Sequence, residues 1–207
     1  MSQNRFQAYQ NGIFQLLDVI SPYFILNMAW FVLSLPIVTL VPATGGLYYA
    51  TYVLARDGDA GLADLWHGFR THFWQSWWWF GLNMLAYGLL FVNFTFYGAF
   101  SGAWVIWVRA TIIIVTLVWS GLQLYMFPFL MVQEDKRLMV ALRNSYVALV
   151  FQPLQTFGFV ILTLALVGLS TIFALPSWII ITASLCLTIS NRAAIRALKS
   201  LHPELFM

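Results

Sequence analysis

The chain consists largely of long apolar runs in which charged residues are almost absent. Of its 207 residues, 61% are hydrophobic and only 8% are charged, with ten basic and seven acidic side chains. Soluble domains carry about 25% charged residues, so a soluble chain with this composition could not cover its own surface. The runs have the length of membrane-spanning helices. The sequence therefore predicts an all-α, polytopic integral membrane protein in contact with the lipid bilayer.

Five segments are long and apolar enough, or nearly so, to cross the membrane. A bilayer core of about 30 Å needs about 20 helical residues. The segments are 22–41, 76–100, 104–132, 151–174 and the short 176–190, which follows a tight turn at Leu175-Pro176. A sixth piece, 43–55, is apolar but too short to cross comfortably. We expect one membrane domain over residues 1–207: a bundle of five long helices and one short helix after Pro42, preceded by an N-terminal segment, 1–21.

Eight of the ten basic residues lie in alternate connections between these segments or in the tail. They lie in segment 56–75, in segment 133–150 and in the tail 191–207: Arg56, Arg70, Lys136, Arg137, Arg143, Arg192, Arg196 and Lys199. The connections around 100–103 and 175–177 hold neither lysine nor arginine. Because cytoplasmic loops are enriched in these residues, the pattern places all three basic regions, and hence the C-terminus, in the cytoplasm.

Two of the cytoplasmic connections have the pattern of amphipathic helices. In residues 62–73, five apolar side chains fall on one helical face: Leu62, Leu65, Trp66, Phe69 and Phe73. In residues 137–149, a second stripe contains Leu138, Leu142, Tyr146 and Leu149. Apolar residues at this spacing predict a helix that lies in the plane of the membrane interface. We expect both helices to lead directly into a span.

Helix breakers interrupt the first apolar run, which reads LSLPIVTLVPATGG over residues 33–46. Pro36 should kink the span 22–41, because proline removes a backbone hydrogen bond. Pro42 suits the first turn of a new helix, which predicts a separate short helix over 43–55 that contains Gly45 and Gly46. The freed backbone groups cannot face lipid, so Thr39, Thr44, neighbouring helices or water must satisfy them.

The depth of this break decides between two interpretations. At mid-depth it would resemble the discontinuous helices of transporters and could hold an anionic or hydroxyl-rich group. At the outer interface it would be only a turn. Pro42 lies about 30 Å along a helix from Pro22, which favours the turn and a cytoplasmic N-terminus. If 43–55 does not return through the membrane, the N-terminus lies outside.

Polar side chains within the spans are the candidate ligand-binding residues. Polar groups are expensive in hydrocarbon and are functional candidates there. Together with the threonines of the break, they form the set Asn27, Thr39, Thr44, Asn83, Arg109 and Gln123. The alternative for each amide is a hydrogen bond that holds two helices together, and the alternative for Arg109 is that its long side chain reaches the outer interface.

The sequence offers little for catalysis. His67 and His72 are five residues apart, whereas helical zinc motifs use pairs four apart. Cys186 is the only cysteine, which excludes an internal disulfide and a cysteine-based metal cluster. No glycine-rich phosphate loop is present. We expect no enzymatic activity, no metal, no cofactor and no nucleic-acid partner.

A weak internal repeat relates the two amphipathic regions. At an offset of 80 residues, Gln75-Ser76-Trp77 aligns with Gln155-Thr156-Phe157. Both copies begin on the cytoplasmic side, which would make them parallel repeats of the kind found in transporters. Chance similarity between leucine-rich segments is the alternative.

The N-terminal third resembles the YesL-like family of small bacterial membrane proteins, a domain of unknown function. The resemblance lies in five short motifs: Asn27-Met28-Ala29-Trp30, Leu35-Pro36-Ile37-Val38-Thr39, Pro42-Ala43-Thr44, Leu47-Tyr48-Tyr49 and Phe69-Arg70-x-x-Phe73-x-Gln75-Ser76. Here His72-Phe73-Trp74 replaces the Asn-Phe-Lys expected for the family. The later helices match in hydropathy alone.

The resemblance implies a bacterial cell membrane location and an accessory protein encoded beside carbohydrate ABC transporters and glycan-degrading enzymes. The loops lack the Glu-Ala-Ala…Gly pattern of ABC permeases, so we do not interpret the chain as the permease itself. Two functions follow. One is a non-enzymatic accessory or scaffold protein that partners a carbohydrate ABC transporter or another membrane protein through its amphipathic helices. The other is a small transporter or channel with a polar site near segment 33–46.

Overall fold

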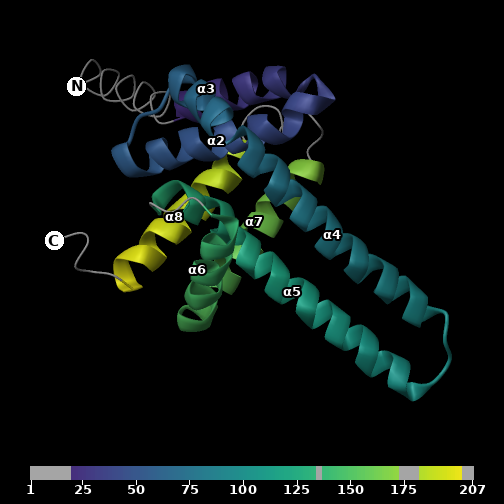
Figure 1. The fold of residues 1–207 in the computed structure, drawn as a ribbon. Helices are drawn as coiled ribbons and strands as arrows, with labels where there is room; N and C mark the ends of the chain where they lie inside the picture. The colour runs from purple at the N-terminus through teal and green to yellow at the C-terminus, as the bar shows by residue number, and fades with distance from the viewer. Residues whose placement is uncertain (1–19, 134–136, 173–181, 202–207) are drawn as a thin grey trace, which may run out of the picture.

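A computed structural model describes residues 20–133, 137–172 and 182–201 (Figure 1). All regular elements in these ranges are helices. The first is helix Ile20–Ser34. The others are α2 (Ile37–Asp57), α3 (Leu62–Thr71), α4 (Phe73–Gly98), α5 (Ala103–Val132), α6 (Leu138–Phe151), α7 (Pro153–Ile172) and α8 (Ala183–Leu201). The all-α prediction is confirmed.

Three of these helices are long and apolar enough to cross a membrane: α2, α4 and α5. Helices α6 and α7 qualify as a fourth span only as a pair, and they are bent by 105° where they meet. The described part of the chain is thus a helical membrane protein with three or four candidate spans. The expected fifth segment, 176–190, lies partly outside the described residues.

The first apolar run breaks six residues earlier than expected. Helix Ile20–Ser34 ends before Leu35-Pro36, and α2 then runs to Asp57 with Pro42 inside it. The expected span 22–41 is therefore divided, and the expected short helix 43–55 is the larger part of a candidate span. Pro36 can precede α2 because it has extended dihedral angles and needs no N–H there. Pro42 lies only six residues into the helix, where the loss of one hydrogen bond is tolerated.

Helix Ile20–Ser34 and α2 form an antiparallel hairpin whose turn is Leu35-Pro36. The Trp30 indole donates a hydrogen bond to the Thr44 hydroxyl, 3.2 Å away, across the turn. Deeper in the hairpin, Leu26 packs in one cluster with Leu47 and Ala50. Leu35 and Ile37 at the turn are 66% and 85% exposed, so the break lies at the surface of the molecule. The break in segment 33–46 is thus a short turn at Leu35-Pro36 between two packed helices.

Helix α8 packs against α2 and α5 and contributes small residues to the core. Ala193, Ala194 and Ala197 are buried in the same cluster as Tyr125 and Phe127 of α5. We expected a span 176–190 and a tail from 191, but α8 continues through residue 190 to Leu201 without a break. The N-terminal segment before residue 20, the turn at Leu175-Pro176 and the rest of the tail lie outside the described residues.

The two amphipathic connections are separate helices, α3 and α6, but they do not use their faces as expected. In α3, Leu65 and Phe69 are buried against α2, whereas Leu62 and Trp66 of the same stripe are 56% and 50% exposed. In α6 the buried residues are Ala141, Ser145, Ala148 and Leu149, and Tyr146 of the expected stripe is exposed. Most of the buried side chains of α6 are small, and small side chains permit its close approach to α5.

The same local geometry occurs where α3 meets α4 and where α6 meets α7. A single residue, His72 or Gln152, separates the two helices in each case. The Ser76 and Thr156 hydroxyls then donate hydrogen bonds to the carbonyl of that residue, over 2.8 and 2.9 Å. These positions are those of the 80-residue sequence offset. The arrangement long helix, short helix, long helix thus occurs twice, as α2–α3–α4 and as α5–α6–α7 (Figure 1).

Close packing of α2 against α3 depends on Gly46. A Cβ atom at this position would lie 2.7 Å from the Leu65 carbonyl oxygen and 3.0 Å from the Phe69 backbone nitrogen. Because backbone atoms cannot move aside as a side chain can, we expect Gly46→Ala to lower the free energy of unfolding by about 1–3 kcal/mol. Thermal unfolding of the detergent-solubilised protein measures this loss. Gly158→Ala on α7 is the control, because nothing lies within 4 Å of the added Cβ atom; equal effects of the two substitutions would contradict the packing argument.

Candidate functional site

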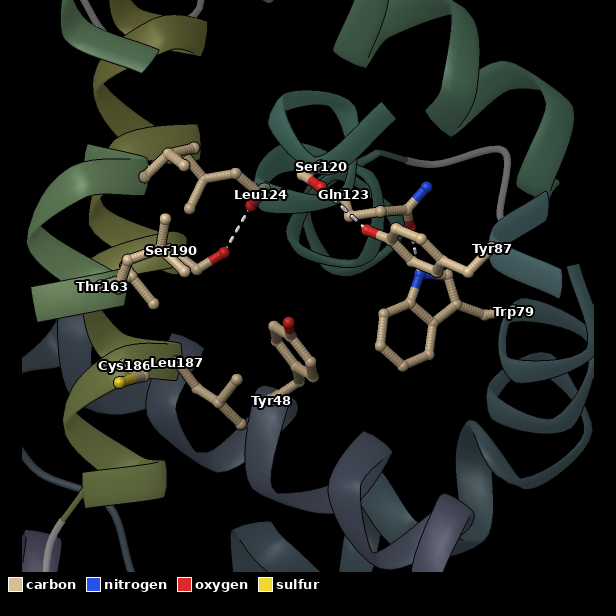
Figure 2. A pocket seen from close by; sticks show the side chains of 12 residues that line it. Tyr48, Trp79, Tyr87, Ser120, Gln123, Leu124, Thr163, Cys186, Leu187 and Ser190 are labelled. Atoms are coloured by element: carbon tan, nitrogen blue, oxygen red, sulfur yellow. Dashed lines mark hydrogen bonds between the residues drawn. The ribbon is translucent and has the colours of Figure 1, made fainter. Parts of the chain in front are cut away.

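An inner pocket of about 310 Å³ lies between α2, α4, α5, α7 and α8 (Figure 2). It falls within the size range of small-molecule sites. Six residues that line it carry polar side chains: Tyr48, Tyr87, Ser120, Gln123, Thr163 and Ser190. The other lining residues are Trp79, Leu124, Val160, Leu164, Cys186 and Leu187, so no charged side chain lines the pocket. The Tyr48 hydroxyl points into its centre (Figure 2).

Hydrogen bonds between α4 and α5 form one wall of the inner pocket. The Gln123 Oε1 atom accepts from the Trp79 indole at 2.8 Å and from the Asn83 amide at 3.1 Å. The Asn83 Oδ1 atom in turn accepts from the Trp119 indole at 3.2 Å. The Gln123 Nε2 atom is buried without a hydrogen-bond partner. This network fixes the register of the two longest helices.

The hydroxyl groups of the pocket donate their protons inside the protein. Ser120 donates to the Thr116 carbonyl at 2.8 Å, Thr163 donates to the Phe159 carbonyl at 2.8 Å, and Ser190 donates to the Leu124 carbonyl. Since Ser120 has a single proton, Tyr87 must be the donor in its 3.0 Å contact with Ser120. The three aliphatic hydroxyls can therefore only accept further hydrogen bonds, whereas the Gln123 Nε2 atom and the Tyr48 hydroxyl can donate.

Two of the six predicted ligand-binding residues, Asn83 and Gln123, lie together, and Gln123 lines the inner pocket. Asn27 lies elsewhere and is fully buried. Its Oδ1 atom accepts a 2.8 Å hydrogen bond from the Ser184 backbone nitrogen. Ser184 is in the first turn of α8, where backbone N–H groups have no partner within the helix. Asn27 thus caps α8 from another helix.

The threonines and glycines of the broken segment serve the turn and its packing. The Thr39 hydroxyl contacts the Leu33 and Pro36 carbonyl oxygens at 2.5 and 2.9 Å, which satisfies the backbone groups that the break frees. Thr44 binds Trp30 and the Leu40 carbonyl. Gly45 faces Ser76 of α4, as Gly46 faces α3. None of these residues lines the inner pocket.

Arg109 is held near the connection between α4 and α5. Its guanidinium lies over the Phe94 ring, 4.1 Å from the ring centroid. Such cation–π contacts stabilise a charge that has lost part of its hydration. Arg109 does not line the inner pocket. The six predicted residues are therefore divided among four places rather than gathered in one cavity.

Sequence reasoning missed most of the residues that line the inner pocket. Tyr48 belongs to a motif that we noted, but nothing marked it as facing a pocket. Thr163 and Ser190 lie in apolar helices, where such hydroxyls commonly bond to their own backbone. Within the described residues, no three His, Cys, Asp or Glu side chains gather in a geometry that could hold a metal ion.

The fold and the inner pocket define a helical membrane protein with a neutral, hydroxyl-lined hollow between its helices. Residues 23–94 match a family model described as "Protein of unknown function, DUF624". The match covers helix Ile20–Ser34 from residue 23, α2, α3 and most of α4. No curated protein and no solved structure matches the chain.

Substitution of Asn83 tests the hydrogen-bond network between α4 and α5. We expect Asn83→Leu to destabilise the protein by about 1–3 kcal/mol, because it leaves the Trp119 indole unpaired and removes a donor to Gln123. Asn93→Leu is a matched control, since Asn93 is exposed on the same helix and its amide donates only to the Leu89 carbonyl of its own helix. Thermal unfolding in detergent measures the stability of both variants relative to the unsubstituted protein. A loss for Asn93→Leu as large as that for Asn83→Leu would contradict the interpretation.

Proposed function

We propose that the protein is a non-enzymatic accessory protein that binds another integral membrane protein through the hairpin formed by α4 and α5. The supporting observation is the exposure of this hairpin, which extends away from the other helices (Figure 1). None of the most apolar stretch of α4 is buried within the chain, against 56% of that of α2. A helix that packs against few helices of its own chain leaves its faces for lipid or for a partner.

One face of α4 is suited to a partner helix rather than to lipid alone. Gly81 and Gly88 lie two helical turns apart, and nothing within 4 Å would meet a Cβ atom at either position. Leu85, between them, is 62% exposed. Because attraction between helices in lipid depends on close van der Waals packing, small residues beside an exposed leucine favour a helix–helix contact.

The partner that we propose is a membrane subunit of a carbohydrate ABC transporter. The resemblance to the YesL-like family, stated above from residues 27–76, supports this choice and a location in the bacterial cell membrane. A non-enzymatic role is supported by the use of polar side chains: Asn27, Asn83, Asn191 and Gln123 bond to other helices. These amides hold the bundle together.

We also propose the orientation that the basic residues favour. Exposed arginines flank α3 and α6, namely Arg56, Arg70, Arg137 and Arg143, which supports a cytoplasmic location for both short helices. The connection 99–102 would then be external. The antiparallel hairpin of helix Ile20–Ser34 and α2 supports a cytoplasmic N-terminus, since both ends of such a hairpin lie on one side.

Cysteine labelling in intact cells tests this orientation. In a Cys186→Ser background, we expect Ser101→Cys to react with a membrane-impermeant maleimide in intact cells. We expect Asp59→Cys, in the exposed connection between α2 and α3, to react only after the cells are opened. The reverse pattern would show that the protein has the opposite orientation.

Site-specific photo-crosslinking in native membranes tests the proposed partner. With a photoreactive amino acid at Leu85, we expect a crosslinked product that mass spectrometry identifies as a membrane subunit of a carbohydrate transporter. Met139 on α6, which is 75% exposed compared with 62% for Leu85, is the control position and should give no such product. Products with lipid alone, or the same products from both positions, would contradict the proposal.

A further inference from the structure

A second hollow lies beside the inner pocket, and the two share one lining residue. This hairpin pocket, of about 380 Å³, lies between α4 and α5 and includes Leu90, Phe94, Ile112 and Ile113. Tyr87 lines both pockets. The hairpin pocket is almost entirely apolar, whereas the inner pocket presents hydroxyl oxygens. The protein thus has a largely apolar pocket with several polar groups, next to a second pocket that is more apolar still.

We propose that the two pockets together bind a neutral, hydroxyl-headed lipid, with its head group in the inner pocket and one chain in the hairpin pocket. The proposal goes beyond the accessory function and does not depend on it. A pocket that offers a few polar groups, beside a more apolar pocket that shares one lining residue with it, fits an amphiphile better than a sugar or an ion. A uniformly polar solute would leave the hairpin pocket unused.

The absence of charge in the inner pocket determines the class of head group. No lysine, arginine or histidine is among its lining residues. A phosphate placed there would lose its hydration without a counter-ion, which is strongly unfavourable. A neutral head group that forms hydrogen bonds in the pocket loses much less hydration free energy than a phosphate does. The pocket therefore selects against phospholipids, which form most of a bilayer.

The direction of the hydrogen bonds determines the chemistry of the head group. The Ser120, Thr163 and Ser190 hydroxyls already donate to backbone carbonyls, so their oxygen atoms can only accept. A ligand that is itself only an acceptor, such as an ester or an ether, could bond to the Tyr48 hydroxyl and the Gln123 amide, but it would leave these three oxygen atoms without a donor. A free hydroxyl on the lipid supplies the missing donor, and the Tyr48 hydroxyl, which points into the pocket, can bond to it (Figure 2).

Tyr87 and Ser120 lie where the two compartments meet. Their hydroxyls are 3.0 Å apart, and the Ser120 proton is donated to Thr116, which lines the hairpin pocket. The head group would lie on the inner side of this contact and the chain on the outer side. The contact is formed by side chains that can rotate, so the lipid can enter sideways from the bilayer.

Alkylation of Cys186 provides a direct test, because this thiol lines the inner pocket and is the only cysteine in the chain. The full-length protein in detergent micelles is treated with N-ethylmaleimide in the presence of 1,2-dioleoylglycerol. We expect saturating dioleoylglycerol to slow alkylation at least five-fold. Its 3-O-methyl ether lacks the hydroxyl donor, and dioleoylphosphatidylglycerol carries a phosphate on the same chains; we expect neither to slow the reaction by more than two-fold.

Equal protection by all three lipids, or protection by none, would overturn the proposal. Neither result depends on a substitution that could affect folding.

A pair of variants tests whether the protecting lipid occupies the inner pocket. Leu164→Trp narrows the inner pocket and should abolish protection. Ile161→Trp is the control, because Ile161 is exposed to a similar extent on the same helix, 65% against 61%, and does not line the pocket.

A second pair tests the position of the lipid chain. Ile113→Trp narrows the hairpin pocket, whereas the neighbouring Ile114 is exposed and lies outside it. We expect Ile113→Trp to raise the dioleoylglycerol concentration needed for half-maximal protection at least ten-fold, and Ile114→Trp to leave it unchanged within two-fold. The same value for both variants would show that the chain does not lie in the hairpin pocket and would overturn the two-compartment proposal.

Discussion

Hydrogen bonds from polar side chains hold α8 against its neighbours, and the position of the inner pocket depends on them. Asn27 caps its first turn, and the Asn191 amide donates to the Tyr48 carbonyl and to the Thr51 hydroxyl, each at 3.0 Å. Ser190 donates to the Leu124 carbonyl of α5. Away from water, leaving such a group unpaired costs about 1–3 kcal/mol, whereas apolar contacts in lipid discriminate little between arrangements. These bonds therefore fix α2 and α5 relative to α8, and the inner pocket lies between them.

The repeated unit of long helix, short helix and long helix explains how a chain with few loops makes sharp turns. At His72 and at Gln152 the chain changes direction within one residue, and a hydroxyl one turn later binds the carbonyl of the residue at the break. The same carbonyl also accepts the backbone N–H of that later residue, so helical hydrogen bonding begins again directly after the break. At Gln152 the helices on the two sides, α6 and α7, are bent by 105°.

The sequence predicted helices well because an apolar run in lipid has few alternatives to a helix. It predicted their ends and their contacts less well. Pro42 carries the signal of a helix start, yet α2 begins at Ile37, directly after Pro36, and contains Pro42. Asn27 and Asn83 carry the same signal of a costly amide, but one caps a distant helix and the other bonds to Gln123. Which helix lies opposite an amide is a property of tertiary packing, and a single sequence does not contain it.

The inner pocket escaped prediction for a different reason, which concerns the residues that line it. Serine and threonine cost little in an apolar helix because they donate to the carbonyl four residues back, as Ser120 and Thr163 do. The bond that makes them tolerable also leaves an acceptor lone pair on each oxygen. A membrane protein can therefore add hydrogen-bond acceptors to a pocket simply by turning such hydroxyls toward one another, with no charged residue. In chains as apolar as this one, the hydrogen-bonding groups of a binding pocket depend on which serine and threonine hydroxyls lie close together. Helix packing determines this, so a single sequence does not reveal it.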